Sequence, residues 1–167
     1  MAANPSFDIS TGCDLQEVDN AVNQALKEIA QRYDFKGTHC TIEFDRAKAE
    51  IRLAADDEFR MDALVDVLRT RLIKRGVPVK NLKFGDLEPA AGQSVRQTVK
   101  LTQGIDQETA RKIIRAIKDA GFKKVQTSIQ GDEVRVSSPS KDELQTVIAF
   151  LRGQDFGVEL KFGNYRG

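Results

Sequence analysis

The feature of this sequence that most restricts its fold is an internal repeat. Three matches occur in the same order in the two halves of the chain, at offsets of 92, 83 and 78 residues. The matched segments are Gly12 with Gly104, Glu50–Leu53 with Glu133–Val136, and Leu82–Gly85 with Leu160–Gly163. Self-similarity at corresponding points of both halves indicates two copies of one folding unit.

Each half shows the same order of elements: a strand, a helix, a hairpin, a helix and a strand. Alternating apolar residues mark the strands, and residues that cap helices precede the helical patterns. The first half predicts a strand at 6–10, a helix after Asp14, a hairpin over 40–53, a helix after Asp56 or Asp57, and a strand at 82–84. The second half predicts a strand at 95–101, a helix after Asp106, a hairpin over 125–136, a helix after Ser140, and a strand at 160–162.

The order β-α-β-β-α-β is the ferredoxin-like arrangement. We therefore predict an α+β protein with two tandem ferredoxin-like domains, each a four-stranded antiparallel sheet with both helices on one face. The expected domains are 1–87 and 95–167, joined by a linker at 88–94. Each copy has only a modest core, so the copies are expected to pack together or to exchange a strand. Gly12 would let the first strand pair with the other sheet, but the pattern leaves this open.

Composition excludes several classes of protein. Hydrophobic residues make up 40% and charged residues 31%, as in globular proteins, and no apolar run reaches the roughly 20 residues of a membrane span. Two cysteines and one histidine are too few for a disulfide framework or a zinc site. We expect a cytoplasmic protein without a cofactor or metal. The net charge of +1 predicts no bulk attraction to nucleic acid.

One candidate site is the run that ends the first long helix. It consists of Arg32, Tyr33, Asp34, Phe35 and Lys36, followed by a glycine. Two rings beside two cations can hold a planar anionic ligand such as a nucleotide, with phosphate on the cations and a base on a ring. The structural alternative is that both rings close the end of the core while the cations are solvated.

The C-terminal run is a second candidate. Lys161, Asn164, Tyr165 and Arg166 again combine cations, an amide and an aromatic ring. A tail with aromatic residues is expected to dock rather than fray. Because the final strand of this fold lies beside the first, we predict that Lys161 and Arg166 close the same nucleotide site as the Arg32 run.

The open faces of the sheets offer a third candidate. Strand alternation places Phe7, Ile9, Ile51 and Leu53 under the helices. The opposite face of the second half is basic, and we predict a nucleic-acid face there from Arg96, Lys100 and Arg135. Neither half presents the stacked aromatic residues of an RNA-recognition motif, so sequence-specific reading by that mode is not expected.

Catalysis has little support in the sequence. His39 has no plausible triad partner, because the neighbouring Cys40 would point to the opposite face of its strand. No glycine loop of the kind that cradles phosphates is present. We therefore predict that the protein is not an enzyme.

Several motifs together resemble the bacterial YajQ family, over nearly the whole chain. They are Pro5–Ile9, Asp14–Val18, Arg32–Gly37, Ile129–Val136 and the aromatic, basic tail. The resemblance implies tandem ribonucleoprotein-like domains in a cytosolic, nucleotide-binding protein without established catalytic activity. It also implies that some members act as cyclic di-GMP effectors that influence transcription, and that others are associated with RNA or GTP. The tail reads Asn164–Gly167 where the family suggests Phe and an acidic ending.

Three hypotheses follow. The first is a nucleotide-binding regulator that responds to cyclic di-GMP, GTP or RNA and acts on transcription through a protein partner. The second is a protein-interaction module whose open sheets or edge strands engage a transcription factor or chaperone. The third is an RNA-binding protein that uses the basic sheet of the second half. None of the three predicts a membrane partner.

Overall fold

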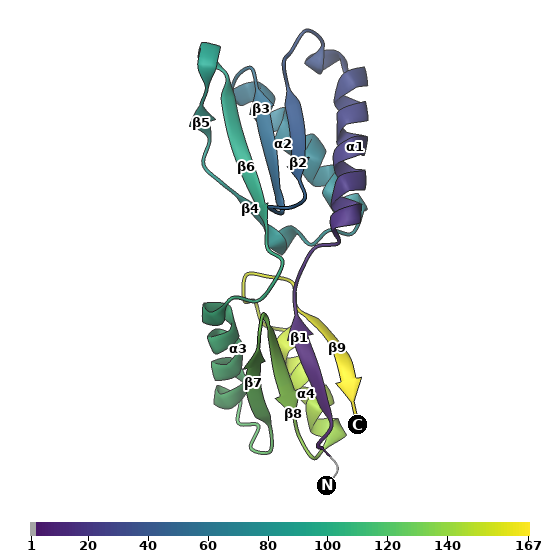
Figure 1. Cartoon of the computed structure of the whole chain (residues 1–167), viewed down its shortest axis with the longest axis vertical. Helices are drawn as coiled ribbons and strands as arrows, with labels where there is room; N and C mark the ends of the chain where they lie inside the picture. The colour runs from purple at the N-terminus through teal and green to yellow at the C-terminus, as the bar shows by residue number, and fades with distance from the viewer. Residues whose placement is uncertain (1–2) are drawn as a thin grey trace. The chain divides into compact units, whose positions relative to one another are not determined.

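The computed structural model describes residues 3–167. The helices are α1 (Leu15–Gln31), α2 (Glu58–Lys74), α3 (Gln107–Asp119) and α4 (Lys141–Arg152), and the short 3-10 turns are η1 (Tyr33–Phe35), η2 (Val79–Asn81) and η3 (Ala91–Gln93). The strands are β1 (Ser6–Ser10), β2 (Thr41–Asp45), β3 (Glu50–Ala55), β4 (Leu82–Phe84), β5 (Glu88–Pro89), β6 (Val95–Leu101), β7 (Gln126–Gln130), β8 (Glu133–Ser137) and β9 (Lys161–Arg166). This order confirms the repeated pattern predicted from the sequence (Figure 1).

The chain divides into two compact units, which we name for their place in the sequence. The middle unit is residues 13–103, and the terminal unit is the segment ending at Gly12 together with Gly104–Gly167. Each unit has four antiparallel strands and two helices, so the prediction of two ferredoxin-like folds is confirmed, and the sheet of the middle unit has a fifth strand, β5, that pairs with β6.

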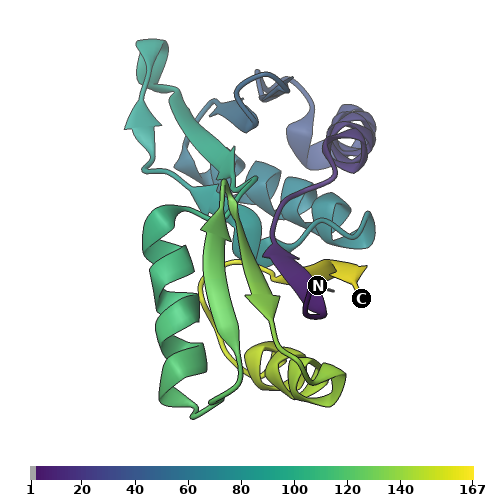
Figure 2. The same ribbon diagram turned by 60° about the horizontal axis from the view of Figure 1, so that its bottom comes forward.

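The units differ from the contiguous domains 1–87 and 95–167 expected from the sequence. The reason is that each half supplies its first strand to the other sheet. In the terminal unit the strand order is β7-β8-β1-β9, and Figure 2 shows the purple β1 beside the yellow β9. In the middle unit the order is β2-β3-β6-β4. Both orders are those of the ferredoxin-like sheet, with the exchanged strand at an inner position.

The expected linker is also part of a unit. Within residues 88–94, β5 pairs with Val95 and Arg96 of β6, and η3 forms the turn between these two strands. Its backbone is thus hydrogen-bonded to the middle unit, and the true crossings between units lie at Gly12–Cys13 and Gln103–Gly104.

Burial follows the predicted alternation in both sheets. Phe7 and Ile9 on β1 and Ile51 on β3 are fully buried, and Leu53 is 1% exposed. The helices begin as expected, with Asp14, Asp57, Asp106 and Ser140 accepting hydrogen bonds from first-turn amides. Asp57 rather than Asp56 caps α2, because the Asp56 carboxylate instead accepts from the His39 amide at 2.6 Å.

The strand exchange also corrects the predicted nucleic-acid face. Arg96 and Lys100 lie on β6, where they pair in register with Ala54 and Glu50 of the middle unit. Arg135 lies on β8 of the terminal unit, opposite Asp8. The three cations therefore do not belong to one face of one sheet, because their strands pair in different units.

Among residues 3–167, no helix combines the length and the apolar character that crossing a membrane requires.

Candidate functional site

A buried carboxylate lies at the centre of the terminal unit's sheet. Asp8 follows Phe7 on β1, so its side chain lies on the face opposite the helices, yet Asp8 is only 4% exposed. Arg135 Nε donates a hydrogen bond to it at 3.0 Å, Asn164 Nδ2 donates at 2.6 Å, and the Arg166 guanidinium lies 3.5 Å away. One carboxylate thus ties β1 to β8 and to β9.

These contacts control the pKa of Asp8. Burial acts to raise the pKa of this carboxyl, but the hydrogen bonds from Arg135 and Asn164, with the charges of Arg135 and Arg166, outweigh it. The pKa of Asp8 therefore lies below its ordinary value, and the carboxylate stays charged near neutral pH.

An extra residue in β9 sets the directions of the tail side chains. Gly163 pairs with Asp8 and Arg166 pairs with Ser6, so β9 has one more residue than β1 between these two pairs. Asn164 takes the left-handed conformation there, with φ of 54°, which asparagine tolerates better than most residues. Without this bulge, Tyr165 would lie on the open face of the sheet and Arg166 would lie on the helix side.

The bulge brings Tyr165 to the helix side, where Phe162 also lies. The Phe7 ring contacts both, with centroid distances of 6.0 Å to Phe162 and 6.3 Å to Tyr165. Tyr165 is nevertheless 59% exposed. The sequence prediction that the tail docks is thus confirmed, while one face of the Tyr165 ring stays available to a ligand.

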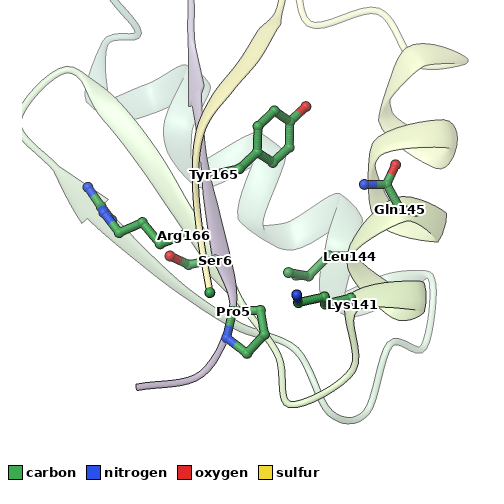
Figure 3. Close-up of a pocket in the computed structure, with 8 residues that line it drawn as sticks. Pro5, Ser6, Lys141, Leu144, Gln145, Tyr165 and Arg166 are labelled. Atoms are coloured by element: carbon green, nitrogen blue, oxygen red, sulfur yellow. The ribbon is translucent and has the colours of Figure 1, made fainter. Parts of the chain in front are cut away.

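Tyr165 lines a hollow between the end of β9 and α4, which we call the helix-side hollow. Its volume is about 290 Å³, and its walls include Pro5, Lys141, Leu144 and Gln145. Figure 3 shows the Tyr165 ring on the α4 side with Gln145 facing it, whereas Arg166 points to the opposite side of the strand. The hollow therefore combines an aromatic wall, an apolar floor, an amide and an ammonium group.

The Arg32 run lies in the middle unit, at the C-terminal end of α1. Arg32 donates to both oxygens of Asp34, at 3.0 and 2.7 Å, and to Glu28 at 3.3 Å. The hydrogen bonds to Asp34 raise the pKa of Arg32 and lower that of Asp34. The charge of Arg32 is thus balanced by carboxylates of its own helix end.

The two rings of that run have different environments. Phe35 is 6% exposed and belongs to the core of the middle unit, so it cannot stack on a base. Tyr33 is 85% exposed, and the Lys36 ammonium lies 5.8 Å from its ring centroid. Only Tyr33 and Lys36 of this run therefore present groups that a nucleotide could contact.

A shallow hollow of about 380 Å³ lies beside Arg32, with Lys27, Glu28 and Arg71 among its walls. Glu28 is one of its walls and accepts hydrogen bonds from Arg71, at 2.7 and 3.0 Å, and from Arg32. The hydrogen bonds from Arg71 hold the pKa of Glu28 below its ordinary value. Two of the three cations in its walls, Arg32 and Arg71, are thus already paired with Glu28.

The structure does not bring the two predicted runs into one unit. Lys161 and Arg166 do lie beside the first strand, as predicted, since Lys161 pairs with Ser10. That strand, however, has left the unit that contains Arg32 and Lys36. The fact that the last strand lies beside the first therefore does not place Lys161 and Arg166 beside the Arg32 run.

Three residues of the terminal site were not predicted from the sequence. The sequence around Asp8 does not indicate a site, because the residues that bind Asp8 are more than a hundred positions away in the sequence. Lys141 and Gln145 lie on the first turns of α4, on a face that helical periodicity treats as solvated. The bulge that turns Tyr165 towards them depends on the register between β1 and β9.

Comparisons with a family model and with individual known proteins lead to the same family. A family model described as "Nucleotide-binding protein YajQ-like" matches residues 5–166. Proteins named "Nucleotide-binding protein" from Chloroherpeton thalassium and Carboxydothermus hydrogenoformans are 49% and 52% identical over 166 residues, which cover 99% of this chain and 100% of theirs. A protein of the same name from Syntrophotalea carbinolica is 53% identical over 162 residues, 97% of this chain and 99% of its own.

Proposed function

The chain belongs to the YajQ-like family of nucleotide-binding proteins, and from this premise we propose that its nucleotide binds at the tail of β9. The base occupies the helix-side hollow against Tyr165. The observation that carries this proposal is the hollow itself, which joins an exposed ring, an amide and a cation. Counting only residues 3–167, the hollows beside Arg32, on the open face of the terminal unit and beside His39 have no phenylalanine or tyrosine among their walls.

The size of the hollow supports a base rather than a complete nucleotide. Pockets that enclose drug-sized ligands measure roughly 300–1,000 Å³, and this hollow of about 290 Å³ lies at the lower limit. The Gln145 amide can donate to and accept from the edge of a base. Lys141 lies at the mouth and supplies a cation for phosphate.

Two other tail residues, Asn164 and Arg166, contact Asp8. Asn164 is hydrogen-bonded to this carboxylate, so we assign it a positioning role, while Lys161 and Arg166 supply positive charge. Tyr33 and Lys36 stay a second candidate contact surface, in the middle unit, without a role for Phe35 or for the Arg32–Asp34 pair.

The function we propose is a response to the ligand rather than catalysis. Cyclic di-GMP, GTP and RNA are the ligands to test, and transcription is the proposed output, through a protein partner in the cytoplasm. The arrangement of the site supports binding without chemistry, because the charge of Asp8 is held by Arg135, Asn164 and Arg166 instead of facing the hollow.

Replacing Tyr165 by alanine is expected to weaken nucleotide binding. Stacking of a base on an aromatic side chain contributes about 1–3 kcal/mol, so Kd should rise roughly 5- to 150-fold. Calorimetric titrations with cyclic di-GMP, GTP and a short RNA measure this change. The matched control is Tyr33→Ala, which removes the other tyrosine and is expected to leave Kd within about twofold if the tail is the site.

Intrinsic fluorescence distinguishes the two tyrosines directly. The chain has two tyrosines and no tryptophan, so Tyr33→Phe leaves Tyr165 as the sole fluorophore, and Tyr165→Phe leaves Tyr33. Because phenylalanine still stacks, both variants should bind. Ligand is expected to quench the emission of Tyr165 and not that of Tyr33, after correction for absorbance with free tyrosine. Quenching of Tyr33 alone would move the site to the middle unit.

A further inference from the structure

A second hollow lies on the opposite side of the same strands, on the open face of the terminal unit's sheet. We call it the open-face hollow, and its volume is about 470 Å³. All four strands or the segments that flank them contribute to it. Its walls are Ala3, Asn4, Ser6, Gln126, Arg135, Ser137, Arg166 and Gly167. These walls bring two guanidinium groups, two hydroxyl groups and two amides together without a carboxylate side chain.

Asp8 holds both guanidinium groups beside this hollow without occupying it. Arg135 uses its Nε to bind Asp8 at 3.0 Å, and Arg166 places one terminal nitrogen 3.5 Å from the same carboxylate. Within residues 3–167, the two terminal nitrogens of Arg135 have no hydrogen-bond partner in the protein. Each guanidinium therefore keeps N–H groups that can donate hydrogen bonds to an oxygen atom of a ligand.

The side chains of this arrangement carry a net positive charge. Two guanidinium groups face one carboxylate, and Asp8 is itself 4% exposed and covered by its partners. Arg135 and Arg166 have about 35% and 43% of their side chains exposed, so a ligand can reach them. An anion that binds both guanidinium groups would balance the charge that Asp8 leaves unpaired.

The duplicated sheet of the middle unit provides an internal comparison. Strand register places Thr98 of β6 opposite Arg52, as Asp8 of β1 lies opposite Arg135. Arg52 thus corresponds to Arg135, but its guanidinium already binds Asp45 at 2.8 Å and Glu50 at 3.1 Å. The equivalent arginine is therefore occupied by carboxylates of its own hairpin.

The two units differ more at the position of Arg166 than at the position of Arg135. Arg166 pairs with Ser6, and the corresponding pair in the middle unit is Glu88 with Arg96. An acidic residue thus stands where the terminal unit has its second guanidinium. Ser137 likewise corresponds to Ala54, which has no hydroxyl group. The middle unit therefore lacks both of these donors at the corresponding positions, although it has Arg96 where the terminal unit has Ser6.

We propose that the open-face hollow is a phosphate site that binds a phosphodiester or diphosphate group. Guanidinium groups pair with phosphate oxygens by two parallel hydrogen bonds, and serine hydroxyls and amides supply further donors. Asp8 is the positioning residue that sets the two guanidinium groups. The assignment of the anion to a nucleotide rests on the proposed function, whereas the anion site itself rests on the residues of the hollow.

Calorimetric titration with sodium pyrophosphate at constant ionic strength tests the site without a base. Arg166→Glu introduces the residue that the middle unit has at this position and should abolish measurable binding. Arg135→Gln should weaken binding about 10- to 100-fold, since hydrogen bonds to charged groups are the strong ones. The matched control, Arg52→Gln, should change Kd by less than twofold.

Two further measurements keep the test independent of folding. Ser137→Ala matches the residue of the other sheet, so it should preserve the thermal transition while weakening pyrophosphate binding about threefold or more. Thermal melts of the arginine variants show whether the terminal unit is intact. Equal pyrophosphate affinity in wild type, Ser137→Ala and Arg166→Glu would overturn the proposal.

The same variants separate this proposal from the proposed function. Pyrophosphate binding that needs Arg135 but persists in Tyr165→Ala supports the phosphate site, even if no nucleotide depends on Tyr165. Nucleotide binding that needs Tyr165 but is unchanged by Arg166→Glu supports the base site and overturns the phosphate site. Wild type and Arg166→Glu are then titrated with cyclic di-GMP and with an RNA of about six nucleotides. The ligand that supplies the phosphate group is the one whose affinity falls in Arg166→Glu.

Discussion

A fragment of residues 13–103 is expected to fold on its own, whereas a fragment of residues 1–87 is expected to show no cooperative unfolding transition. The first contains the complete middle unit, including β6 between β3 and β4. The second follows the apparent sequence repeat but lacks this inner strand. Without β6, β4 loses the strand with which it pairs and the core loses Val99 and Leu101, which are 0% and 6% exposed.

The first strand is a poor substitute for β6 in the shorter fragment. In the corresponding register, Phe7 would take the place of Gln97, and Asp8 would take that of Thr98. Asp8 would then lie opposite Arg52, whose guanidinium already binds Asp45 and Glu50, and it would lose the contacts with Asn164 and Arg166, so its charge would be less well compensated. Phe7 would also add volume to a core that already fills its space.

Far-UV circular dichroism and urea unfolding of the two fragments measure this difference. The expected result is one cooperative transition for 13–103 and a gradual change for 1–87. Joining residues 104–167 through a short turn to residues 3–12 provides the control for the terminal unit. Because Arg166 pairs with Ser6, these ends are adjacent, and the permuted protein should fold. Cooperative unfolding of 1–87 would show that the exchange of strands is not required.

Replacing Asp8 by asparagine is expected to destabilise the terminal unit strongly. Removing one partner of a fully buried ion pair costs about 3–5 kcal/mol. Arg135 and Arg166 are partly exposed and can recover water, so we expect a loss of about 2–3 kcal/mol in the free energy of unfolding of this unit. The same change should weaken pyrophosphate binding, because both guanidinium groups lose their fixed position.

The pH dependence of stability gives this prediction a specific signature. The folded pKa of Asp8 lies below its unfolded value, so its contribution is complete above the ordinary aspartate pKa of about 3.9 and is lost as the pH falls through the lowered value. The difference between wild type and Asp8→Asn should therefore be constant from about pH 7 to pH 5 and shrink below pH 4. Urea unfolding at several pH values measures it.

The matched control for Asp8 is Glu50→Gln in the middle unit. Glu50 binds Arg52 at 3.1 Å on the equivalent open face, where its partner is also bound to Asp45. Surface pairs of this kind contribute about 0–1 kcal/mol. A loss for Asp8→Asn that is no larger than the loss for Glu50→Gln would contradict the structural role assigned to the buried carboxylate.

Much of the fold could be predicted because it follows from local patterns. The alternation of Phe7 with Ile9 and of Ile51 with Leu53 gave the buried faces of both sheets, and Asp14 and Ser140 marked helix starts. The exchange of β1 and β6 could not be decided in this way. Both strands present the same alternation to either sheet, so pairing depends on which partners satisfy residues such as Asp8.

The site was only partly predictable for a related reason. The tail was predicted from its composition, and the structure places Tyr165 beside a hollow. The Arg32 run has a similar composition, but Asp34 and Glu28 neutralise Arg32, and Phe35 is part of the core. The residue types in a run indicate which chemical groups are present, whereas burial and the partners of each side chain in the folded protein decide which of these groups a ligand can contact.

A ¹H–¹⁵N correlation spectrum of the whole protein, titrated with cyclic di-GMP, GTP or the short RNA, tests the location of the nucleotide site most directly. We predict that the amide signals that shift on binding come from 6–8, 135–138, 140–145 and 162–167, in the terminal unit. Signals from 32–37 should stay in place. Shifts confined to 32–37, with none at the tail, would contradict the account.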